Sequence, residues 1–445
     1  MYKNQKYFWD ALKVRDNRDP AYSVNLPSHS PKVPFKRPFQ PENINRSMEN
    51  NKSRYSEKHL ELSPTQKFKA VAAQPAYFSQ EGLLLTRNSK LPNYEPTRCS
   101  SNENGIIRAY AANTNQGIVR DYNEDRVSII LNIVKPQNRQ NETWPRCSFF
   151  GVYDGHGGSA CADFLRDNLH QFVIKELDFP WNPYEALRKG FAAAEQHFQE
   201  YALSQFNKGI PERSGSCAIV ALLVGDVCYV ANVGDSRAVL CGGNNRSALP
   251  LSRDHKPCDE LEKLRIQKAG GKIYQTQQLQ DEQQVFVGPL RVLPGRLSVS
   301  RTFGDIEAKL ERFGGKSNVV VAEPELRSFK IQEDHQFIVL ASDGIFDKMS
   351  SNEVVDIMTK ELDSNPNIHQ GCSIGVEQVL KESINRRTLD NITVVVVAFQ
   401  GEQMKRLKNE LNKRNQIKKA VQAVLGNQED QENTPGLINT YKRYI

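Results

Sequence analysis

A short apolar segment that ends in an acidic turn constrains this chain more than any other feature. Ser148–Tyr153 is rich in aromatic and β-branched residues, which is typical of a buried strand. It runs directly into Asp154-Gly155-His156-Gly157-Gly158, and Asp-Gly marks a turn. The pattern predicts a strand that carries a carboxylate out of a packed sheet, with an imidazole two residues later. Because Asp-Gly turns are also ordinary hairpin chemistry, this segment alone indicates no function.

The same arrangement recurs along the chain. Asp235, Asp343 and Asp390 each lie at or beside the end of an apolar run, and Glu124-Asp125 adds an acidic pair. If one sheet edge gathers these residues, carboxylates about 4 Å apart repel by about 4 kcal/mol at an effective dielectric near 20, so the cluster needs cations or protons. Clusters of oxygen ligands suit Mg²⁺ or Mn²⁺, and paired ions suit phosphate-ester hydrolysis. Alternatively, these are separate strand-end turns; the residues alone leave both readings open.

Charge is distributed unevenly along the 445 residues. Residues 1–100 carry 17 Lys and Arg against 9 Asp and Glu, and residues 401–445 carry 9 against 5. The total of +7 therefore leaves a mildly acidic body over residues 101–400. Since no basic stripe interleaved with aromatic residues crosses that body, the composition argues against nucleic acid as a partner.

Apolar patterning predicts an α+β fold. The expected helices share apolar residues at helical spacing, and they are Ala160–Leu177, Tyr184–Phe206, Glu260–Ala269, Glu353–Leu362 and Ile374–Asn385. The expected strands share short apolar runs, and they are Val127–Val134, Ala218–Val224, Val227–Val233, Arg237–Cys241, Phe337–Leu340 and Ile392–Phe399. Arg237–Cys241 is expected to pair back on the strand before it, and the Gln-rich stretch Tyr274–Val287 is expected to be a loop. Because strands and helices come in groups, we expect antiparallel sheets with flanking helices.

Eight segments carry a resemblance to a known family. In order they are Arg120–Asp125, Tyr153–Gly158, Ser214–Ser216, Asn232–Arg237, Asp254–Pro257, Leu297–Asp305, Ala341–Asp347 and Leu389–Thr393. Together they resemble the type 2C family of metal-dependent serine/threonine protein phosphatases, over residues 105–400. The resemblance implies a β-sandwich of two antiparallel sheets flanked by α-helix layers, with a metal site at one end. It also implies phosphoprotein substrates.

The resemblance further implies two Mg²⁺ or Mn²⁺ ions. Asp154 would bridge both ions, and the Gly155 carbonyl would bind the first. Asp343 and Asp390 would bind the second, and Glu124 would approach the first directly or through water. A metal-bridging water or hydroxide would then attack phosphorus, without a phosphoenzyme.

The remaining implied roles concern a third ion and the substrate. Asp235, with Asp343 and Asp347, matches a weaker third metal site of the family. Arg120 would hold the substrate phosphate through its guanidinium fork. His156 would be the general acid that protonates the departing Ser or Thr oxygen.

Other motif residues are expected to support the site. Asp254–Pro257 is interpreted as a turn and scaffold, and Arg301 and Asp305 are expected to form a buried ion pair with each other. Two alternative functions stay open: an inactive relative that only binds phosphopeptides, and a metal-dependent phosphodiesterase or nuclease. The complete set of motif residues argues against the first, and the acidic body argues against the second.

The cysteines and apolar runs bear on the compartment. The eight cysteines form no Cys-x-x-Cys pair and no zinc spacing, so free thiols are expected. No apolar run is long enough to span a bilayer, and the N-terminus has no apolar signal core. We therefore expect an intracellular monomer, in the cytoplasm or nucleus.

Both ends of the chain are expected to extend beyond the phosphatase-like domain at 105–400. Residues 1–104 hold 10 of the 22 prolines and show no periodicity, which predicts a disordered basic tail. Within it, Tyr7–Leu12 or Pro31–Phe39 could dock a partner, although incidental aromatics explain them as well. Residues 401–445 begin with a basic helical pattern, Met404–Leu425, that is expected to pack on the domain rather than on a membrane.

Overall fold

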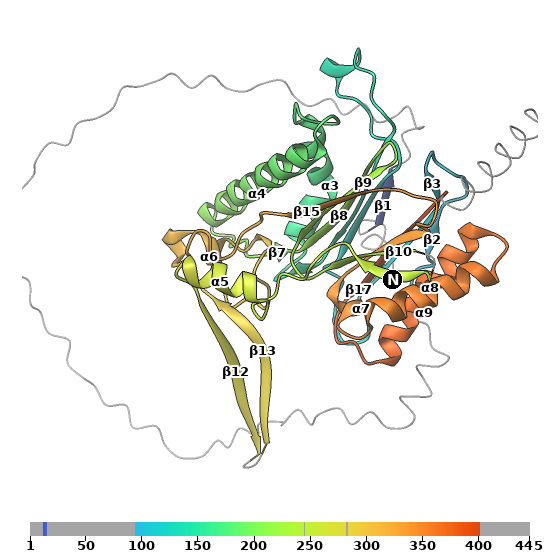
Figure 1. Ribbon diagram of the computed structural model, residues 1–445. Coiled ribbons are helices and arrows are strands. Elements are labelled where there is room, and N and C mark those ends of the chain that lie inside the picture. Colours follow the sequence, from blue (N-terminus) through green and yellow to red (C-terminus); the bar gives the residue numbers. More distant parts are fainter. Residues whose placement is uncertain (1–11, 16–93, 244, 282–283, 401–445) are drawn as a thin grey trace, which may run out of the picture. The chain divides into compact units, whose positions relative to one another are not determined.

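The computed structural model describes residues 12–15, 94–243, 245–281 and 284–400. Within them, two six-stranded sheets stack face to face, and helices cover the outer side of each sheet (Figure 1). The first sheet, in the order β1-β4-β5-β8-β9-β15, consists of Leu12–Arg15, Arg126–Ile130, Cys147–Tyr153, Ala218–Val224, Val227–Val233 and Glu325–Lys330. The second, in the order β11-β10-β16-β17-β3-β2, consists of Ser247–Pro250, Arg237–Gly242, Phe337–Ala341, Ile392–Phe399, Ile107–Asn115 and Arg98–Cys99.

Side-chain alternation along the strands divides the core into three layers. Phe150 and Val152 of β5 face the second sheet and pack with Val395 and Val397 of β17. Phe149, on the opposite face of β5, packs instead against the helices of the first sheet. The outer face of the second sheet is covered in the same way by a third cluster. The expected helix-sheet-sheet-helix sandwich is therefore confirmed.

Two pairs of long helices form the outer layers. On the first sheet lie α3 (Ala160–Lys175) and α4 (Pro183–Asn207), and on the second lie α8 (Ser351–Ser364) and α9 (Ile368–Asn385). Their starts follow from capping chemistry. Asn182 accepts a hydrogen bond from the Glu185 backbone ahead of α4, and Ser350 forms a capping box with Glu353 ahead of α8. All four helices lie in the expected segments. Their boundaries differ from the expected ones by at most two residues, except that α9 begins at Ile368 rather than at Ile374.

The expectation for Arg237–Cys241 is wrong. This segment is β10, and it pairs with β16 of the second sheet rather than with β9. The chain changes sheets at Gly234, whose φ of +109° and close approach to Cys217 leave no room for a side chain. An apolar run shows that a strand forms but does not show which neighbour it joins, so the sequence pattern missed this crossover.

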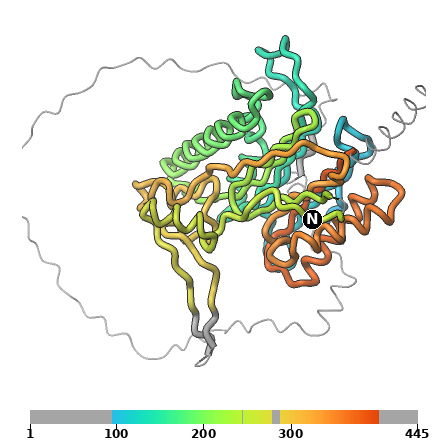
Figure 2. Tube along the Cα trace, in the orientation of Figure 1, coloured from blue at the N-terminus to red at the C-terminus, as the bar shows by residue number. Residues whose placement is uncertain are grey.

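The Gln-rich stretch is also not the expected loop. It forms a two-stranded antiparallel ribbon, β12 (Lys272–Asp281) with β13 (Gln284–Leu293), which projects away from the sheets (Figure 2). Ahead of it lies α5 (Glu260–Lys268), which confirms the helix expected in this segment and is capped by the Asp259 side chain. The base of the ribbon packs on a small core cluster through Val292 and Ile273, but the Gln-rich part of β12 carries no alternating apolar pattern.

Two strands lie in the segment where no ordered element was expected. β1 pairs in parallel with β4, and β2 pairs with β3, although both lie within residues 1–104. Apart from the β1–β4 pair, the neighbouring strands of the two sheets, β2 and β3 included, are antiparallel. Pro31–Phe39, most of Tyr7–Leu12 and the predicted helix Met404–Leu425 lie outside the described residues.

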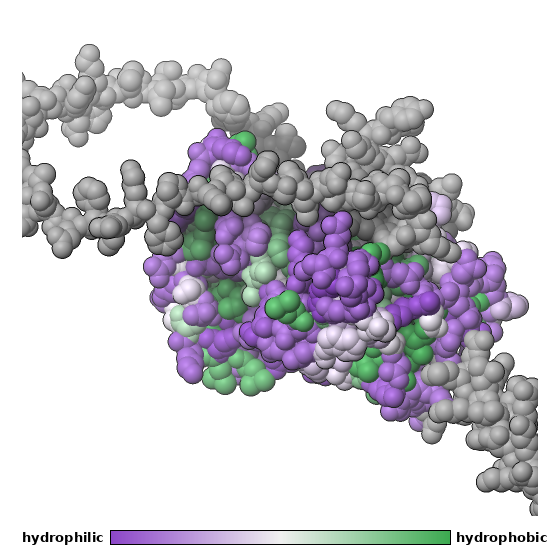
Figure 3. All heavy atoms as spheres, turned by 90° about the horizontal axis from the view of Figure 1, so that it is seen from above, coloured by the Kyte–Doolittle hydropathy of each residue, from purple (hydrophilic) through white to green (hydrophobic). Residues whose placement is uncertain are grey.

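The face of the molecule drawn in Figure 3 is mainly hydrophilic. In Figure 3, apolar residues appear only as small separate groups between polar ones. Among the described residues, no helix combines the length and apolar character that crossing a bilayer requires.

Candidate active site

Three carboxylates from three strand ends meet at one place. Asp154 follows β5, Asp235 follows β9, and Asp343 follows β16 and begins the short helix α7 (Asp343–Phe346). One oxygen atom of each lies within 4.8 Å of the others. We call these three residues the carboxylate triad. Three of the four strand-end carboxylates predicted from the sequence therefore converge rather than forming separate turns, and Asp390 is not among the three.

The triad carries negative charge that the described protein groups do not fully offset. Burial raises the pKa of Asp154 well above its usual value, and the charge of Asp343 is the next largest cause. Burial likewise raises the pKa of Asp343, with the charge of Asp235 adding to it. Both effects act against the ionised form. Divalent cations with oxygen ligands relieve such a cluster, so the residues present fit Mg²⁺ or Mn²⁺.

Asp390 and Arg120 form the adjoining part of the site. Arg120 Nη2 donates to Asp390 Oδ2 at 2.7 Å, and Arg120 Nε donates to the Leu389 carbonyl at 3.2 Å. The Arg120 side chain is 48% exposed, so it can reach a substrate. The charge of Asp390 also contributes to the raised pKa of Asp154 and Asp343, which places it within electrostatic reach of the triad.

Lys256 lies where the third metal was expected. Its Nζ atom is 3.5 Å from Asp235 Oδ2 and 2.9 Å from Asp347 Oδ1. The ammonium group thus neutralises part of the charge that a third ion would otherwise bind. Asp254-His255-Lys256-Pro257 was expected to serve only as a turn and scaffold, so the direct contact of Lys256 with two predicted ligands was missed.

Glu124 is connected to the turn after β5 rather than to the triad. Its Oε1 atom accepts a hydrogen bond from the Gly158 backbone at 2.5 Å, and its own backbone N–H donates to Asn391 Oδ1 at 2.9 Å. The Glu124 carbonyl also lies so close to Gly155 that a side chain there would overlap it. Gly155 is therefore required by packing, independently of the metal role implied for its carbonyl.

Asp125, which the sequence analysis named in an acidic pair but gave no role of its own, is buried beside Glu124. Burial is the main cause that raises its pKa to about 7, although the hydrogen bond from Thr393 acts in the opposite direction. Thr393 Oγ1 donates to Asp125 Oδ2 at 2.6 Å, and Thr114 bonds Thr393 in turn. Asn391 similarly ties together the carbonyls of Gln116 and Tyr122. Both Asp125 and Asn391 stand directly beside predicted ligands, which was the available signal.

The expected ion pair between Arg301 and Asp305 is wrong. Asp305 Oδ2 lies 2.8 Å from His156 Nε2, whereas Arg301 donates through Nη2 to Glu262 Oε1 at 2.6 Å. Arg265 and Ser300 bind the other oxygen of Glu262. Arg301 and Asp305 are only four positions apart, but the chain turns sharply between them at Gly304, whose φ is +69°. Sequence proximity therefore suggested the wrong partner.

Replacing Glu262 with glutamine is expected to destabilise the protein. Glu262 is 1% exposed, and loss of its charge leaves Arg301 and Arg265 partly buried without a counter-ion, which costs about 3 kcal/mol. Burial would raise the pKa of Glu262, but hydrogen bonds from Arg301, Arg265 and Ser300 lower it far below its usual range. The stability that Glu262 contributes is thus present above its unfolded pKa, about 4.3, and is lost on acidification. Thermal melts of both proteins at several pH values measure this, and a constant difference at all pH values would contradict it.

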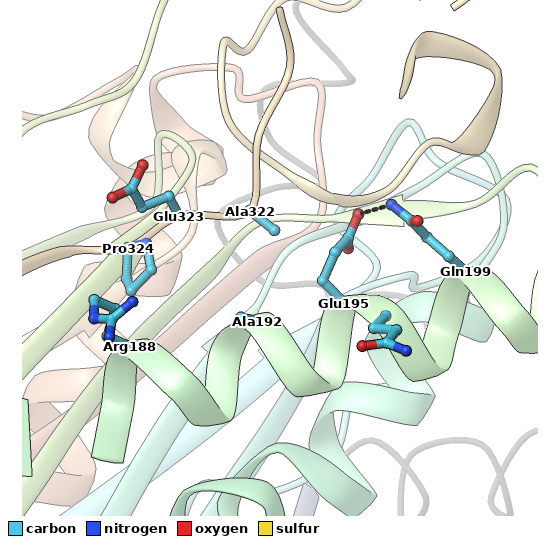
Figure 4. A pocket seen from close by; sticks show the side chains of 8 residues that line it. Arg188, Ala192, Glu195, Gln199, Ala322, Glu323 and Pro324 are labelled. Carbon is cyan, nitrogen blue, oxygen red and sulfur yellow. Dashed lines mark hydrogen bonds between the residues drawn. The ribbon is translucent and has the colours of Figure 1, made fainter. Parts of the chain in front are cut away.

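Two surface cavities lie outside the triad itself. One, of about 370 Å³, lies between α4 and Ala322–Pro324, and Figure 4 shows Arg188 and Glu195 of α4 on its wall. The other, of about 410 Å³, is lined by Arg237, Asp254 and Lys256 among others. Through Lys256, only the second adjoins the carboxylates.

The comparisons with known proteins agree with this geometry. The family model "Protein phosphatase 2C" matches residues 115–392. The chain belongs to the protein phosphatase 2C family. It is therefore a metal-dependent protein serine/threonine phosphatase, as the order of motifs had implied.

Several relatives illustrate the likeness. A protein of Oryza sativa subsp. japonica named probable protein phosphatase 2C 54 is 33% identical over 286 residues, which cover 64% of this phosphatase and 71% of the relative. A second rice protein, probable protein phosphatase 2C 27, is 30% identical over 305 residues, or 68% and 78% of the two chains. A solved serine-threonine phosphatase 2C from Toxoplasma gondii has a TM-score of 0.50 at 23% identity, covering 69% of this chain and 100% of that one, and it shows the shared fold.

Proposed function

We propose that this phosphatase hydrolyses phosphoserine and phosphothreonine in proteins at a two-ion site built around Asp154. The observation that supports the proposal most strongly is the convergence of three carboxylates from both sheets within 4.8 Å. Asp154 would bridge two ions, with the Gly155 carbonyl and Glu124 near the first and with Asp343 and Asp390 on the second. When bound, Mg²⁺ or Mn²⁺ would lower the pKa of a water ligand and offset the charge on the phosphoryl oxygens.

Arg120 would bind the substrate phosphate. Its half-exposed guanidinium is held by the Leu389 carbonyl and by Asp390, which orients it beside the proposed second ion. Among the described residues, the Arg120 Nη1 atom has no hydrogen-bond partner, and it would donate to a phosphoryl oxygen. A planar fork suits this task better than an ammonium group because it can donate two parallel hydrogen bonds.

His156 would protonate the oxygen of the departing Ser or Thr. Its side chain is 33% exposed, so a bound phosphopeptide can reach it. Although burial acts to lower the pKa of His156, the charge and hydrogen bond of Asp305 outweigh it and raise that pKa. A raised pKa favours the protonated ring that a general acid requires near neutral pH.

A weaker third ion at Asp235, Asp343 and Asp347 is the remaining part of the metal proposal. Any such ion would have to displace the Lys256 ammonium from Asp235 and Asp347. We therefore expect this position to bind more weakly than the other two.

Removal of divalent ions is expected to abolish hydrolysis of a phosphothreonine peptide, and added Mn²⁺ or Mg²⁺ is expected to restore it. Blocking thiols should leave the activity intact, because no cysteine takes part; all eight are free, and six are buried. The exposed Cys258 lines the cavity beside Lys256, so a Cys258→Ser variant is the control for indirect effects of its modification. Full activity in the presence of EDTA would contradict the proposal.

Two competing functions are tested by measuring phosphopeptide binding and the cleavage of DNA. Tight phosphopeptide binding without turnover in saturating Mn²⁺ would favour an inactive binding module, and cleavage of single-stranded DNA would favour a nuclease.

The free thiols support a reducing, intracellular location, in the cytoplasm or nucleus, as part of the proposal. The monomeric state and a partner for the N-terminal segment stay predictions.

A further inference from the structure

Three very short strands bring His156 next to Asp305. β6 (Gly155–His156), β7 (Gly215–Ser216) and β14 (Phe303–Gly304) form a separate small sheet in the order β14-β7-β6. In it, Gly215 pairs with His156 on one side and with Gly304 on the other. The central strand therefore lies between the segment that carries the histidine and the segment that leads into Asp305.

The two side chains meet directly above the central strand. Asp305 Oδ2 lies 2.8 Å from His156 Nε2, and the Asp305 side chain is only 10% exposed. A carboxylate only accepts hydrogen bonds, so the proton on this pair belongs to Nε2. His156 Nδ1 is then the ring nitrogen that remains for a substrate.

Gly215 is the residue that makes this contact fit. A Cβ atom at position 215 would overlap both the Asp305 carboxylate and His156 Nε2. The backbone there has no positive φ, so conformational freedom does not explain the glycine. Close approach by the His156–Asp305 pair does explain it.

The backbone of Asp305 is held in an uncommon conformation. Its φ and ψ are 46° and 49°, in the left-handed region, where a residue other than glycine is disfavoured. A hydrogen bond from the Asp305 N–H to the Ser214 carbonyl, 3.1 Å long, fixes it there. Glu195 of α4 accepts a hydrogen bond from Gly304 N–H at 3.0 Å and supports the same turn. Such a conformation persists where the surrounding structure determines it, often at functional sites.

We propose that Asp305 is a positioning residue for His156, made possible by Gly215. By accepting the Nε2–H hydrogen bond, Asp305 fixes the plane of the imidazole so that Nδ1–H faces the leaving oxygen of the substrate. This inference rests on the proposed function, in which His156 is the general acid.

In the step that Asp305 would assist, the bond between phosphorus and the Ser or Thr oxygen breaks, and its electron pair stays on that oxygen. The proton leaves Nδ1 and forms the hydroxyl of the product, so the imidazolium becomes a neutral imidazole. A water molecule supplies the oxygen that takes the vacated place on phosphorus, and the proton it releases restores the imidazolium.

The test is Asp305→Asn, with two substrates that differ in the leaving group. Asparagine is the matched replacement because it tolerates the left-handed conformation better than other residues. For a phosphothreonine peptide, kcat should fall about 10-fold or more with little change in KM, since general acid catalysis contributes about 10²–10⁴-fold in total. Hydrolysis of p-nitrophenyl phosphate should be little changed, because its leaving group departs as a stable anion.

A double-mutant cycle shows whether Asp305 acts through His156. Added to His156→Ala, Asp305→Asn should cause no further loss of kcat on the peptide; a further 10-fold loss would overturn the inference. Equal losses on both substrates, or unchanged kcat on the peptide, would also overturn it. Glu262→Gln is the matched control, because it removes another buried carboxylate without contact to His156 and should show no preference for leaving group. If the wild-type enzyme hydrolyses neither substrate, the proposed function itself fails, which is a separate result.

Discussion

Replacing Asp154 with asparagine is expected to reduce phosphopeptide hydrolysis by roughly 10³-fold, because loss of the proposed bridging ligand would remove about 4 kcal/mol of transition-state stabilisation. The change keeps the shape of the side chain, so the packing behind β5 should persist. Titration calorimetry with Mn²⁺ should show weaker binding or fewer bound ions than in the wild-type protein. Wild-type activity with unchanged Mn²⁺ binding would exclude Asp154 as the bridging ligand.

The same substitution should have the opposite effect on the metal-free protein. The pKa of Asp154 is raised in the folded state by burial and by the charge of Asp343, so its contribution to stability is fully present below the unfolded pKa of about 3.9. That contribution is lost as the pH rises toward the folded pKa. In EDTA near neutral pH, Asp154→Asn should therefore melt at a higher temperature than the wild type, by roughly 2–4 °C per kcal/mol of relieved repulsion.

The pH and the metal distinguish this effect from nonspecific stabilisation. In EDTA, the advantage of the variant should shrink when the pH is lowered toward 4, because the wild-type carboxyl then binds its proton. In saturating Mn²⁺ the order of melting temperatures should reverse, because the wild type binds the ion more tightly. A variant that melts lower than the wild type in EDTA at every pH would contradict the account of charge repulsion in the triad.

Replacing Arg120 with lysine is expected to lower kcat/KM for a phosphopeptide by roughly 10- to 100-fold, since a hydrogen bond to a charged group contributes about 1.5–3 kcal/mol. Lysine keeps the charge but loses the planar fork. It cannot hold both Asp390 and the Leu389 carbonyl, as Arg120 does, and also donate to phosphate, the role proposed for Arg120. Steady-state kinetics measure the loss. A smaller inhibition by inorganic phosphate should accompany it.

A matched control separates loss of the fork from a general loss of arginine. Arg246 is also on the surface and pairs with Asp363, on the side of the second sheet that α8 covers. Arg246→Lys should leave both kcat/KM and phosphate inhibition unchanged. If Arg120→Lys behaves like this control, another group binds the phosphate.

Much of the fold was predictable because buried strands and amphipathic helices leave local patterns. β5, β8, β16 and β17 are apolar runs, and the helices α3 and α4 repeat apolar residues at helical spacing. Which strands pair was less predictable, since β10 is as apolar as its neighbours but pairs with β16 of the second sheet rather than with β9 of the first. The ribbon β12–β13 was missed because its first strand is rich in Gln and lacks a regular alternation of apolar and polar residues.

The residues of the candidate site were likewise predictable from local patterns, whereas their contacts were not. The sequence alone determined which residue types stand at the strand ends, so Asp154, Asp235, Asp343 and Asp390 could be named as a candidate metal cluster from local turns and their order. Only the tertiary structure decided which side chains contact each other. Lys256 lies near Asp235 and Asp347, and Arg301 binds Glu262. Asp305 contacts His156 above Gly215. The physical reason is that turn chemistry depends on neighbours in the chain, whereas an ion pair depends on which distant segments the sheets bring within about 3 Å.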